Sequence, residues 1–233
     1  IINAAGPWVE NICQMDELPM PKAMVLSKGI HVVVPAAKLP VKQVTFSVSQ
    51  DDRPVFVVPR GNTVYIGTTD TRHDHAEVWP EVTAPEVEYL FEPIKRYYGI
   101  QLSRDDCLTS WAGLRPLIYQ PGKSTKEISR KDEVWLSHSG LITIAGGKLT
   151  GYRKMAEDAV LKACEVLGVA YRNVDQDEPL PGGDLSRSLR QSALDLAQIY
   201  PMPDDQSERV IKLYGAEGRD VLALGKDKVL PEG

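Results

Sequence analysis

Cysteine is scarce in this sequence: Cys13, Cys107 and Cys164 are the only three in 233 residues, and they lie far apart. This pattern fits a reducing compartment better than a disulfide framework or a zinc site. No apolar run approaches the roughly 18 residues that a membrane-spanning helix needs. A net charge of −5 and a pI near 5.5 argue against a general nucleic-acid binder, so we expect no nucleic-acid partner.

An initiator methionine, a secretory signal and a G-x-G-x-x-G motif are missing as well. The first residues, Ile1-Ile2-Asn3, have the composition of the end of a buried strand. We therefore expect the sequence to be the C-terminal portion of a longer protein.

Residues 141–153, which read LITIAGGKLTGYR, predict a strand, a tight turn at Gly146-Gly147 and the start of a helix. Glycines and a helix N-terminus allow a flat or anionic ligand to approach the backbone closely. A nucleoside triphosphate loop is improbable because Ile142 and Leu149 stand where it needs glycine and a hydroxyl. A plain connection between strand and helix is the alternative.

The rest of the chain mixes strand and helix patterns. Apolar runs predict strands at 30–34, 55–58 and 64–66, with a hairpin at Arg60-Gly-Asn62. A capping box at Thr83 and Glu86 starts a helix that ends at Gly99. Short strands are expected around Leu108, Ile128, Val134 and Leu141. An acidic linker at 175–183 precedes two or three short helices between 185 and 224.

Six blocks follow one another in a fixed order along residues 1–163. They are Asn3-Ala-Ala-Gly-Pro-Trp8, Ser27-Lys-Gly-Ile-His31, Ile66-Gly-Thr-Thr-Asp70, Trp111-Ala-Gly-Leu-Arg-Pro-Leu117, Ile128-Ser-Arg130 and Ala145-Gly-Gly-Lys-Leu-Thr-Gly-Tyr-Arg153. Together they resemble the FAD-dependent glycerol-3-phosphate dehydrogenases and the related glycerophosphate oxidases. Such an ordered match is far more specific than any single block.

The resemblance implies an α+β (mixed α/β) fold similar to that of D-amino-acid oxidase. In such a fold a substrate-binding antiparallel or mixed sheet interrupts a split FAD-binding domain, and a small helical region follows. The implied segments are 1–14 (FAD-binding), 15–125 (substrate sheet), 126–170 (FAD-binding) and 171–233 (linker and helices). Because the missing glycine motif cradles the FAD pyrophosphate in this family, we expect the chain alone to bind FAD weakly or not at all.

The resemblance also implies an activity: oxidation of sn-glycerol 3-phosphate to dihydroxyacetone phosphate by hydride transfer to flavin. Quinone or oxygen would accept the electrons. The implied location is cytoplasmic, with peripheral association at the inner membrane face for a quinone-linked enzyme. Two alternatives stay open, namely a superfamily oxidase that acts on an amino or hydroxy acid and an inactive fragment that only binds.

Three residues are candidates for the chemistry. His31, with an ordinary pKa near 6.5, could accept the alcohol proton, although a histidine in a half-buried sheet is the plainer interpretation. Arg115 and Arg130 would clamp the substrate by paired N–H donors, whereas ordinary ion pairs are the alternative. We expect Pro116 to end the strand and to leave Arg115 near an open edge.

Lys148 would add positive potential beside the cofactor and contact the substrate. Thr68 and Thr69 could offer hydroxyls to the substrate or form a turn. The implied cofactor-binding residues are Ala5, Gly6, Trp8, Gly146, Gly147, Lys148, Leu149 and Thr150. The irregular cluster of Asp70, His73, Asp74 and His75 suggests solvated surface, so no metal is expected. His31, Arg115, Arg130 and Lys148 are predicted to face one cavity.

Overall fold

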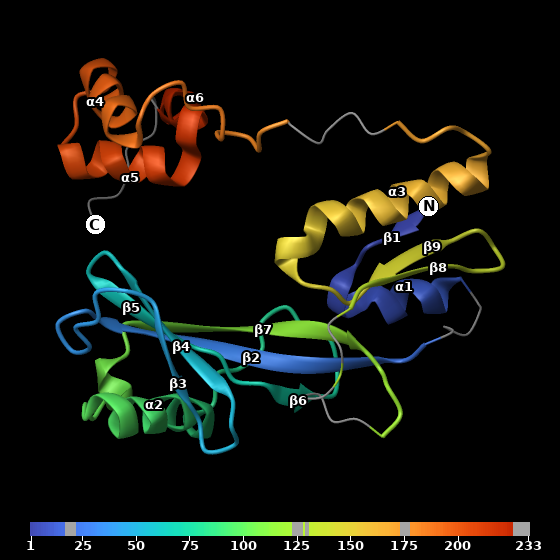
Figure 1. The fold of residues 1–233 in the computed structure, drawn as a ribbon, viewed down its shortest axis with the longest axis horizontal. Helices are drawn as coiled ribbons and strands as arrows, with labels where there is room; N and C mark the ends of the chain where they lie inside the picture. Colours follow the sequence, from blue (N-terminus) through green and yellow to red (C-terminus); the bar gives the residue numbers. More distant parts are fainter. Residues whose placement is uncertain (17–21, 123–127, 129–130, 173–177, 226–233) are drawn as a thin grey trace. The chain divides into compact units, whose positions relative to one another are not determined.

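The computed structural model describes residues 1–16, 22–122, 128, 131–172 and 178–225. The chain divides into two compact units, Ile1–Tyr171 and Arg172–Gly233. The larger unit contains two β-sheets with helices, and the smaller unit is helical (Figure 1). Within the described residues, every helix is too short or too polar to cross a bilayer. The mixed α+β architecture confirms the predicted fold class.

The larger sheet is built around one long strand, β2, whose run Ile30-His-Val-Val-Val34 is rich in β-branched residues that favour an extended backbone. Its strands are β2 (Met24–Pro35), β3 (Thr45–Val48), β4 (Pro54–Arg60), β5 (Thr63–Gly67), β6 (Thr71–His73) and β7 (Thr109–Ile118). β2 pairs antiparallel with β5, β6 and β7, and the order continues from β5 through β4 to β3. The predicted hairpin at Gly61-Asn62 is confirmed, because β4 and β5 pair across it.

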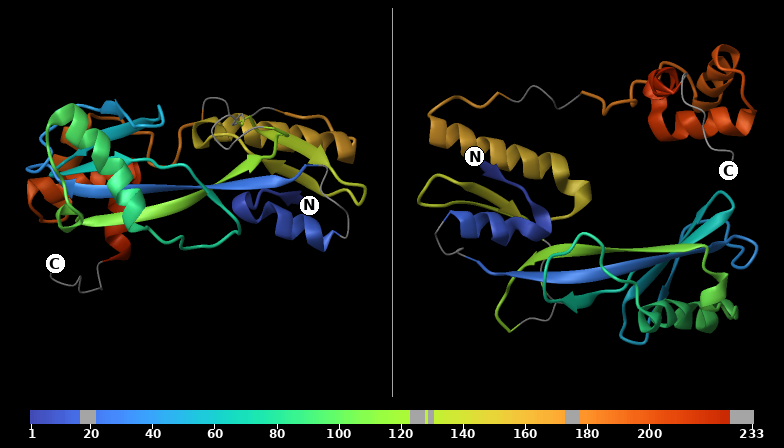
Figure 2. Two further views of the ribbon diagram at one scale, coloured as in Figure 1. Left: turned by 90° about the horizontal axis from the view of Figure 1, so that it is seen from below. Right: turned by 180° about the vertical axis from the view of Figure 1, so that it is seen from behind.

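One face of this sheet is covered by α2 (Ala84–Tyr98), as the two views of Figure 2 show. The predicted capping box is present: the Glu86 carboxylate accepts from the Thr83 backbone N–H (3.0 Å) and hydroxyl (2.8 Å). Gly99 ends the helix with a φ of 68°. Leu90 and Ile94 are fully buried against inward-facing residues of the strands, which are Ile30, Val32, Val34, Val55, Val57, Val64 and Ile66.

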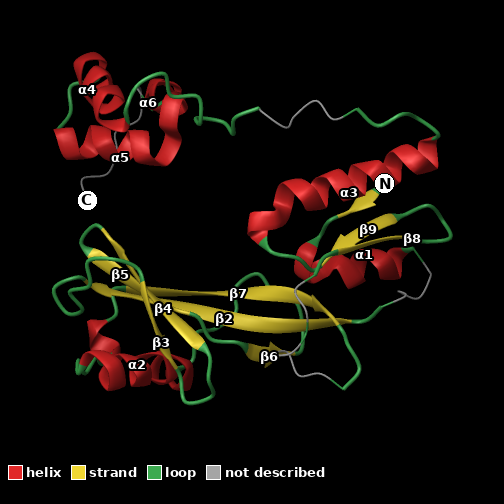
Figure 3. Cartoon of the chain, viewed as in Figure 1, coloured by secondary structure: helices red, strands yellow, loops and turns green. Residues whose placement is uncertain are grey.

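The smaller sheet has the order β1 (Ile2–Asn3), β9 (Ile142–Ala145), β8 (Glu133–Leu136). β1 and β9 run parallel, and β8 is antiparallel to β9. The helical elements beside it are η1 (Gly6–Trp8), α1 (Val9–Met15), η3 (Leu149–Gly151) and α3 (Tyr152–Leu167). Figures 1 and 3 show α1 and α3 on opposite faces of this sheet.

The smaller unit consists of α4 (Leu189–Ile199), α5 (Asp204–Tyr214), η4 (Gly215–Glu217) and α6 (Gly218–Leu224). The sequence predicted two or three short helices here, and α4, α5 and α6 agree with that prediction. They bury Ala193, Leu196 and Ile211 in a small core of their own.

Two sequence predictions about strands need correction. β7 does not end at Pro116 but continues to Ile118, with Pro116 opposite Leu26 of β2. β7 pairs with β2 alone among the described strands, and an edge strand tolerates proline because the missing N–H is not needed on its open side. Ile128 lies in a bend rather than a strand, and its neighbours 123–127 and 129–130 lie outside the described residues.

Candidate functional site

The sheet face opposite α2 carries polar side chains, His31 and Arg115, among apolar ones such as Val33 and Leu117. Residues alternate between faces along a strand, so His31 lies opposite the face of Ile30 and Val32, which pack under α2. Directly paired residues share a face, and His31 pairs with Trp111 while Ser27 pairs with Arg115. The register therefore places His31 and Arg115 on the same face of the sheet.

The Arg115 guanidinium is held across β2 by the chain segment that follows β5. Its Nη2 donates to Thr68 Oγ1 (2.9 Å), and its Nη1 donates to the Thr69 carbonyl (3.2 Å). It can lie there only because Gly29 has no side chain: a Cβ on Gly29 would stand 2.2 Å from Nη2. The half-buried guanidinium is thus positioned by the Thr68–Thr69 segment and by the space above Gly29. A planar guanidinium is the side chain that best matches the geometry of a phosphate or carboxylate.

The His31 imidazole lies between an aromatic ring and a glycine. Its ring stacks on Trp111 with centroids 5.0 Å apart, and Tyr65 contacts Trp111 edge-on at 5.3 Å. A Cβ on Gly67 would stand 2.2 Å from His31 Cδ2, so a side chain at this position would displace the imidazole. Burial, and next the charge of Arg115, lower the pKa of His31. The imidazole is therefore neutral at neutral pH and can accept a proton.

Two loops meet at one edge of the smaller sheet. Asn3 of β1 pairs with Thr143 of the parallel β9, so the segments after both strands leave the sheet at the same end. These segments are Ala5-Gly6 and Gly146-Gly147. Ligands of α/β sheets bind at the carboxyl ends of parallel strands. The buried Asn3 side chain fixes the first loop, accepting from Ala5 N (3.2 Å) and donating to Val9 O (3.1 Å).

The turn after β9 needs both of its glycines. Gly146 and Gly147 have φ values of 81° and 79°, which favour glycine. A Cβ on Gly146 would stand 2.6 Å from the Lys131 carbonyl, and one on Gly147 would stand 2.5 Å from the Met155 sulfur. The glycines therefore allow the turn to pack closely against its neighbours while its outer side remains open.

The predicted helix after this turn begins with the 3-10 turn η3 before α3 proper. The first backbone N–H that donates to a carbonyl of the preceding turn is that of Gly151, which bonds the Lys148 carbonyl at 2.8 Å. The preceding N–H groups of Leu149 and Thr150 have no acceptor inside the helix, as at any helix start. With the exposed Lys148 side chain, they give this end of α3 a positive potential.

A cavity of about 510 Å³ lies between β7 and this turn. It brings Arg115 together with the turn residues, and its lining consists of Leu114, Arg115, Pro116, Leu117, Gly146, Gly147, Lys148, Leu149, Tyr152 and Met155. The volume suits a small-molecule ligand, and the two cations and the glycines suit one that is flat and anionic.

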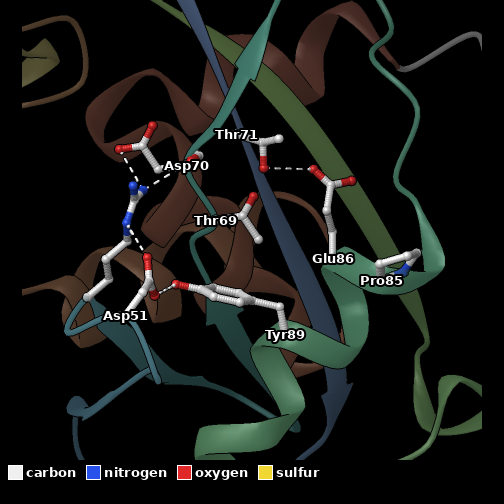
Figure 4. A pocket seen from close by; sticks show the side chains of 8 residues that line it. Asp51, Thr69, Asp70, Thr71, Pro85, Glu86 and Tyr89 are labelled. Carbon is white, nitrogen blue, oxygen red and sulfur yellow. Dashed lines mark hydrogen bonds and ion pairs between the residues drawn. The ribbon is translucent and has the colours of Figure 1, made fainter. Parts of the chain in front are cut away.

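A second cavity of about 230 Å³ opens on the α2 side of the sheet. Figure 4 shows Thr69 among the side chains that line it, together with Glu86 and Tyr89. The Tyr89 hydroxyl donates to Asp51 (2.6 Å), and Arg53 pairs with Asp70 (2.9 Å). These internal partners show that much of the polar surface here is already satisfied within the protein.

The family model described as DAO, FAD dependent oxidoreductase, matches residues 1–153. The chain belongs to the FAD dependent oxidoreductase family. The aerobic glycerol-3-phosphate dehydrogenase of Staphylococcus aureus (strain USA300) is 37% identical over 237 residues, which is 93% of this chain and 41% of that protein. The chain therefore spans less than half the length of the curated relatives it matches.

Solved structures of this kind also match the chain. The glycerol-3-phosphate dehydrogenase from Bacillus halodurans, complexed with FAD, superposes with a TM-score of 0.83 at 36% identity, over 97% of this chain and 46% of that one. NikD, described as an unusual amino acid oxidase, has a TM-score of 0.51 at 14% identity, over 73% of this chain and 46% of that one. The second likeness shows the fold alone.

Some of the predicted site residues line this cavity in the structure, and others lie elsewhere. Arg115, Gly146, Gly147, Lys148 and Leu149 line the cavity of about 510 Å³. His31 and Thr68 are not among its lining residues within the described chain, although His31 shares the face of Arg115 and Thr68 bonds its guanidinium. Arg130 lies outside the described residues.

The remaining predicted residues lie around the two loops or in the sheet. Ala5 and Gly6 follow β1, Trp8 is the N-cap of α1, and Thr150 lies in η3. The Thr69 hydroxyl accepts from the Ile30 N–H at 3.0 Å, and the residue is 3% exposed. Thr69 is therefore occupied by the sheet, and its carbonyl, rather than its hydroxyl, bonds Arg115.

Sequence reasoning missed the residues that position His31 and Arg115. These are Gly29, Gly67, Trp111 and Tyr65, and their roles depend on which strands pair and in which register. The one available signal was that Gly29 lies inside, and Gly67 at the end of, a strand rich in β-branched residues, where glycine can mark a close approach.

Proposed function

We propose that this chain is part of an FAD-dependent oxidoreductase that oxidises sn-glycerol 3-phosphate to dihydroxyacetone phosphate. The observation that carries the proposal is the cavity that Arg115 of β7 shares with Gly146, Gly147 and Lys148. Support comes from family membership and from the 37% identity to a protein named aerobic glycerol-3-phosphate dehydrogenase.

The residues around the cavity fit an FAD. Gly146 and Gly147 keep the turn free of side chains, the start of η3 presents N–H groups, and Lys148 adds a cation. Ala5, Gly6 and Trp8 would contact the cofactor from the neighbouring loop, and Thr150 from η3. When bound, the flavin supplies the acceptor for the hydride that leaves the substrate carbon.

Arg115 and His31 are suited to the two ends of a three-carbon substrate. The guanidinium lies over Gly29, two residues before His31, which corresponds to about 7 Å along an extended strand. Arg115 would bind the phosphate or the reacting oxygen through paired N–H donors, with Arg130 as its partner. Neutral His31 would take the proton of the secondary hydroxyl, and Thr68 would keep the guanidinium in place.

The proposal extends to partners and organisation. The electrons would pass to quinone or oxygen, and the protein would act in the cytoplasm, at the inner membrane face if quinone is the acceptor. Residues 1–14 and 126–170 would belong to the FAD-binding domain, 15–125 to the substrate domain and 171–233 to a linker with a helical domain.

Substrate discrimination tests the proposal. A protein that carries this chain within the full length of its relatives is loaded with FAD and assayed with glycerol 3-phosphate, glycerol and lactate. We expect the KM for glycerol 3-phosphate to be at least about 100-fold below that for glycerol, because Arg–phosphate bonds are charge-assisted. Equal use of glycerol, or preference for the carboxylate, would overturn the proposal.

A further inference from the structure

Three potential metal ligands meet in the loop that follows β6. The potential ligand atoms of His73, His75 and Glu77 all lie within 4.8 Å of one another. Among the described residues, no other set of three such side chains comes this close together. We propose that these three side chains bind a divalent transition metal ion, with Zn²⁺ as the reference case. This differs from the sequence-based interpretation of the loop as solvated surface.

The local backbone explains why these residues meet. His73 is the last residue of β6 and pairs with Leu26 of β2, so its position is fixed by the sheet. The chain bends at residues 74 and 75, directly after β6, and the rings of His73 and His75 lie 5.1 Å apart. Glu77 returns toward the strand, with its Oε1 2.6 Å from His73 Nε2. Asp70 and Asp74 are not members of the group.

The donor set selects the class of metal. Two imidazole nitrogens and one carboxylate oxygen form the three-ligand set of many open zinc sites, in which a fourth position holds water. Mg²⁺ and Ca²⁺ prefer oxygen ligands throughout, so they should bind much more weakly. A groove of about 260 Å³ beside His73 and His75, lined also by Glu10, Asn11 and Gln14 of α1, leaves room for that water.

The competing explanation is a simple His73–Glu77 hydrogen bond. That bond satisfies both groups without a metal, but it does not involve His75. Around a tetrahedral Zn²⁺ the ligand atoms stand about 3.4 Å apart, so the 2.6 Å pair would open by about 0.8 Å. The Arg72 side chain carries a positive charge that would repel a metal cation at this place. It pairs with Asp74 at 3.9 Å, and both side chains are largely exposed, so solvent screens the repulsion.

Calorimetric titration of the purified 233-residue chain with ZnCl₂ tests the proposal, with MgCl₂ as the comparison. We expect one Zn²⁺ per chain, no heat of binding with Mg²⁺, and a rise in melting temperature that EDTA reverses. Co²⁺ bound in place of Zn²⁺ should give the visible absorption of a tetrahedral nitrogen and oxygen site. His73→Ala and His75→Ala should each lower the Zn²⁺ affinity at least 100-fold, and Glu77→Gln at least tenfold.

Matched variants separate this site from other sources of binding. His138→Ala removes an exposed histidine elsewhere, and Glu81→Gln removes a nearby exposed carboxylate, so both should bind Zn²⁺ like the wild type. Circular dichroism without metal establishes that each variant is folded. No binding by the wild type would overturn the proposal. So would binding that persists in the His73→Ala/His75→Ala double variant, including binding that only alkylation of the three free thiols abolishes.

Discussion

The indole of Trp111 stacks on the imidazole of His31, with ring centroids 5.0 Å apart and ring planes 13° apart. The two residues pair across β2 and β7, so the contact follows from the register of the sheet. Trp111 thereby shields from water a histidine whose pKa is lowered, first of all by burial. The shielded ring stays neutral at a pH where an ordinary histidine begins to gain a proton.

Removing the indole should raise the pKa of His31. In Trp111→Ala, water reaches the imidazole and the burial effect weakens, so the pKa moves toward its ordinary value. NMR titration of the His31 ring proton measures this, with assignment by His31→Gln. Trp111→Phe keeps an aromatic ring and should give a smaller shift. A pKa that is unchanged in Trp111→Ala would show that the stack does not control the protonation of His31.

Two effects of Arg115 can be tested separately, namely the effect of its charge on the pKa of His31 and the effect of its planar guanidinium on substrate binding. Arg115→Gln removes the cation, so the pKa of His31 should rise and the acid limb of a kcat/KM profile should move to higher pH. Arg115→Lys keeps the charge and should leave that limb near its original pH. It still loses the paired donors to the substrate, which costs about 1.5–3 kcal/mol, or roughly 10- to 100-fold in KM. Equal pH profiles for both variants would contradict this assignment.

The glycine under the Arg115 guanidinium should matter for binding more than for stability. Gly29→Ala would place a Cβ 2.2 Å from Nη2, and the flexible arginine would move away rather than the backbone. We expect a KM about tenfold higher with a change in unfolding free energy below about 1 kcal/mol. Gly113, the cross-strand partner of Gly29, has no atom within 4 Å of an added Cβ. Gly113→Ala should therefore behave like the wild type in both measurements.

A buried ion pair joins the sheet to α2. Lys28 Nζ lies 2.9 Å from Glu86 Oε2, and both side chains are about nine-tenths buried. Lys28→Ala should lower the free energy of unfolding by about 3–5 kcal/mol, because it leaves a buried carboxylate unpaired. Urea unfolding followed by tryptophan fluorescence measures this in the larger unit, which holds all four tryptophans. Lys38→Ala, which removes the exposed partner of the partly buried Asp106, should cost less than about 1 kcal/mol.

The stability contributed by the Lys28–Glu86 pair should depend on pH. Burial alone would raise the pKa of Glu86, but hydrogen bonds from Lys28 and Thr83 outweigh it, and the net pKa is lowered. The stabilisation by this pair is therefore present above the ordinary glutamate pKa and is lost as pH falls through the lowered value. The difference between wild type and Lys28→Ala should shrink in that acidic range, and a difference that stays constant would contradict the pairing.

Local signals in the sequence were sufficient for parts of the fold. The capping box at Thr83 and Gly99 beyond the last turn give the bounds of α2, because helix ends depend on a few adjacent residues. The glycine turn after β9 was predictable for the same reason. Pro116 was misleading, since whether a proline ends a strand depends on whether that strand lies at a sheet edge, which is a property of the whole fold.

The candidate site was less predictable than the fold. His31 and Arg115 could be named from the blocks that contain them, but the contacts that hold them come from Gly67 and Trp111 on other strands. Those contacts require the cross-strand register, which no local pattern specifies. The His73, His75 and Glu77 group is similar, because the return of the loop that brings Glu77 to His73 leaves no mark in residue spacing.

The most direct test of the central claim is anaerobic reduction of the FAD-loaded protein that carries this chain within the full length of its relatives. Addition of glycerol 3-phosphate should bleach the visible flavin band, and dihydroxyacetone phosphate should form in equal amount. Lys148→Ala should weaken FAD binding, because it removes a cation from the cavity that Arg115 shares. A flavin that binds equally well in Lys148→Ala, or that glycerol 3-phosphate fails to bleach in the wild type, would contradict the account.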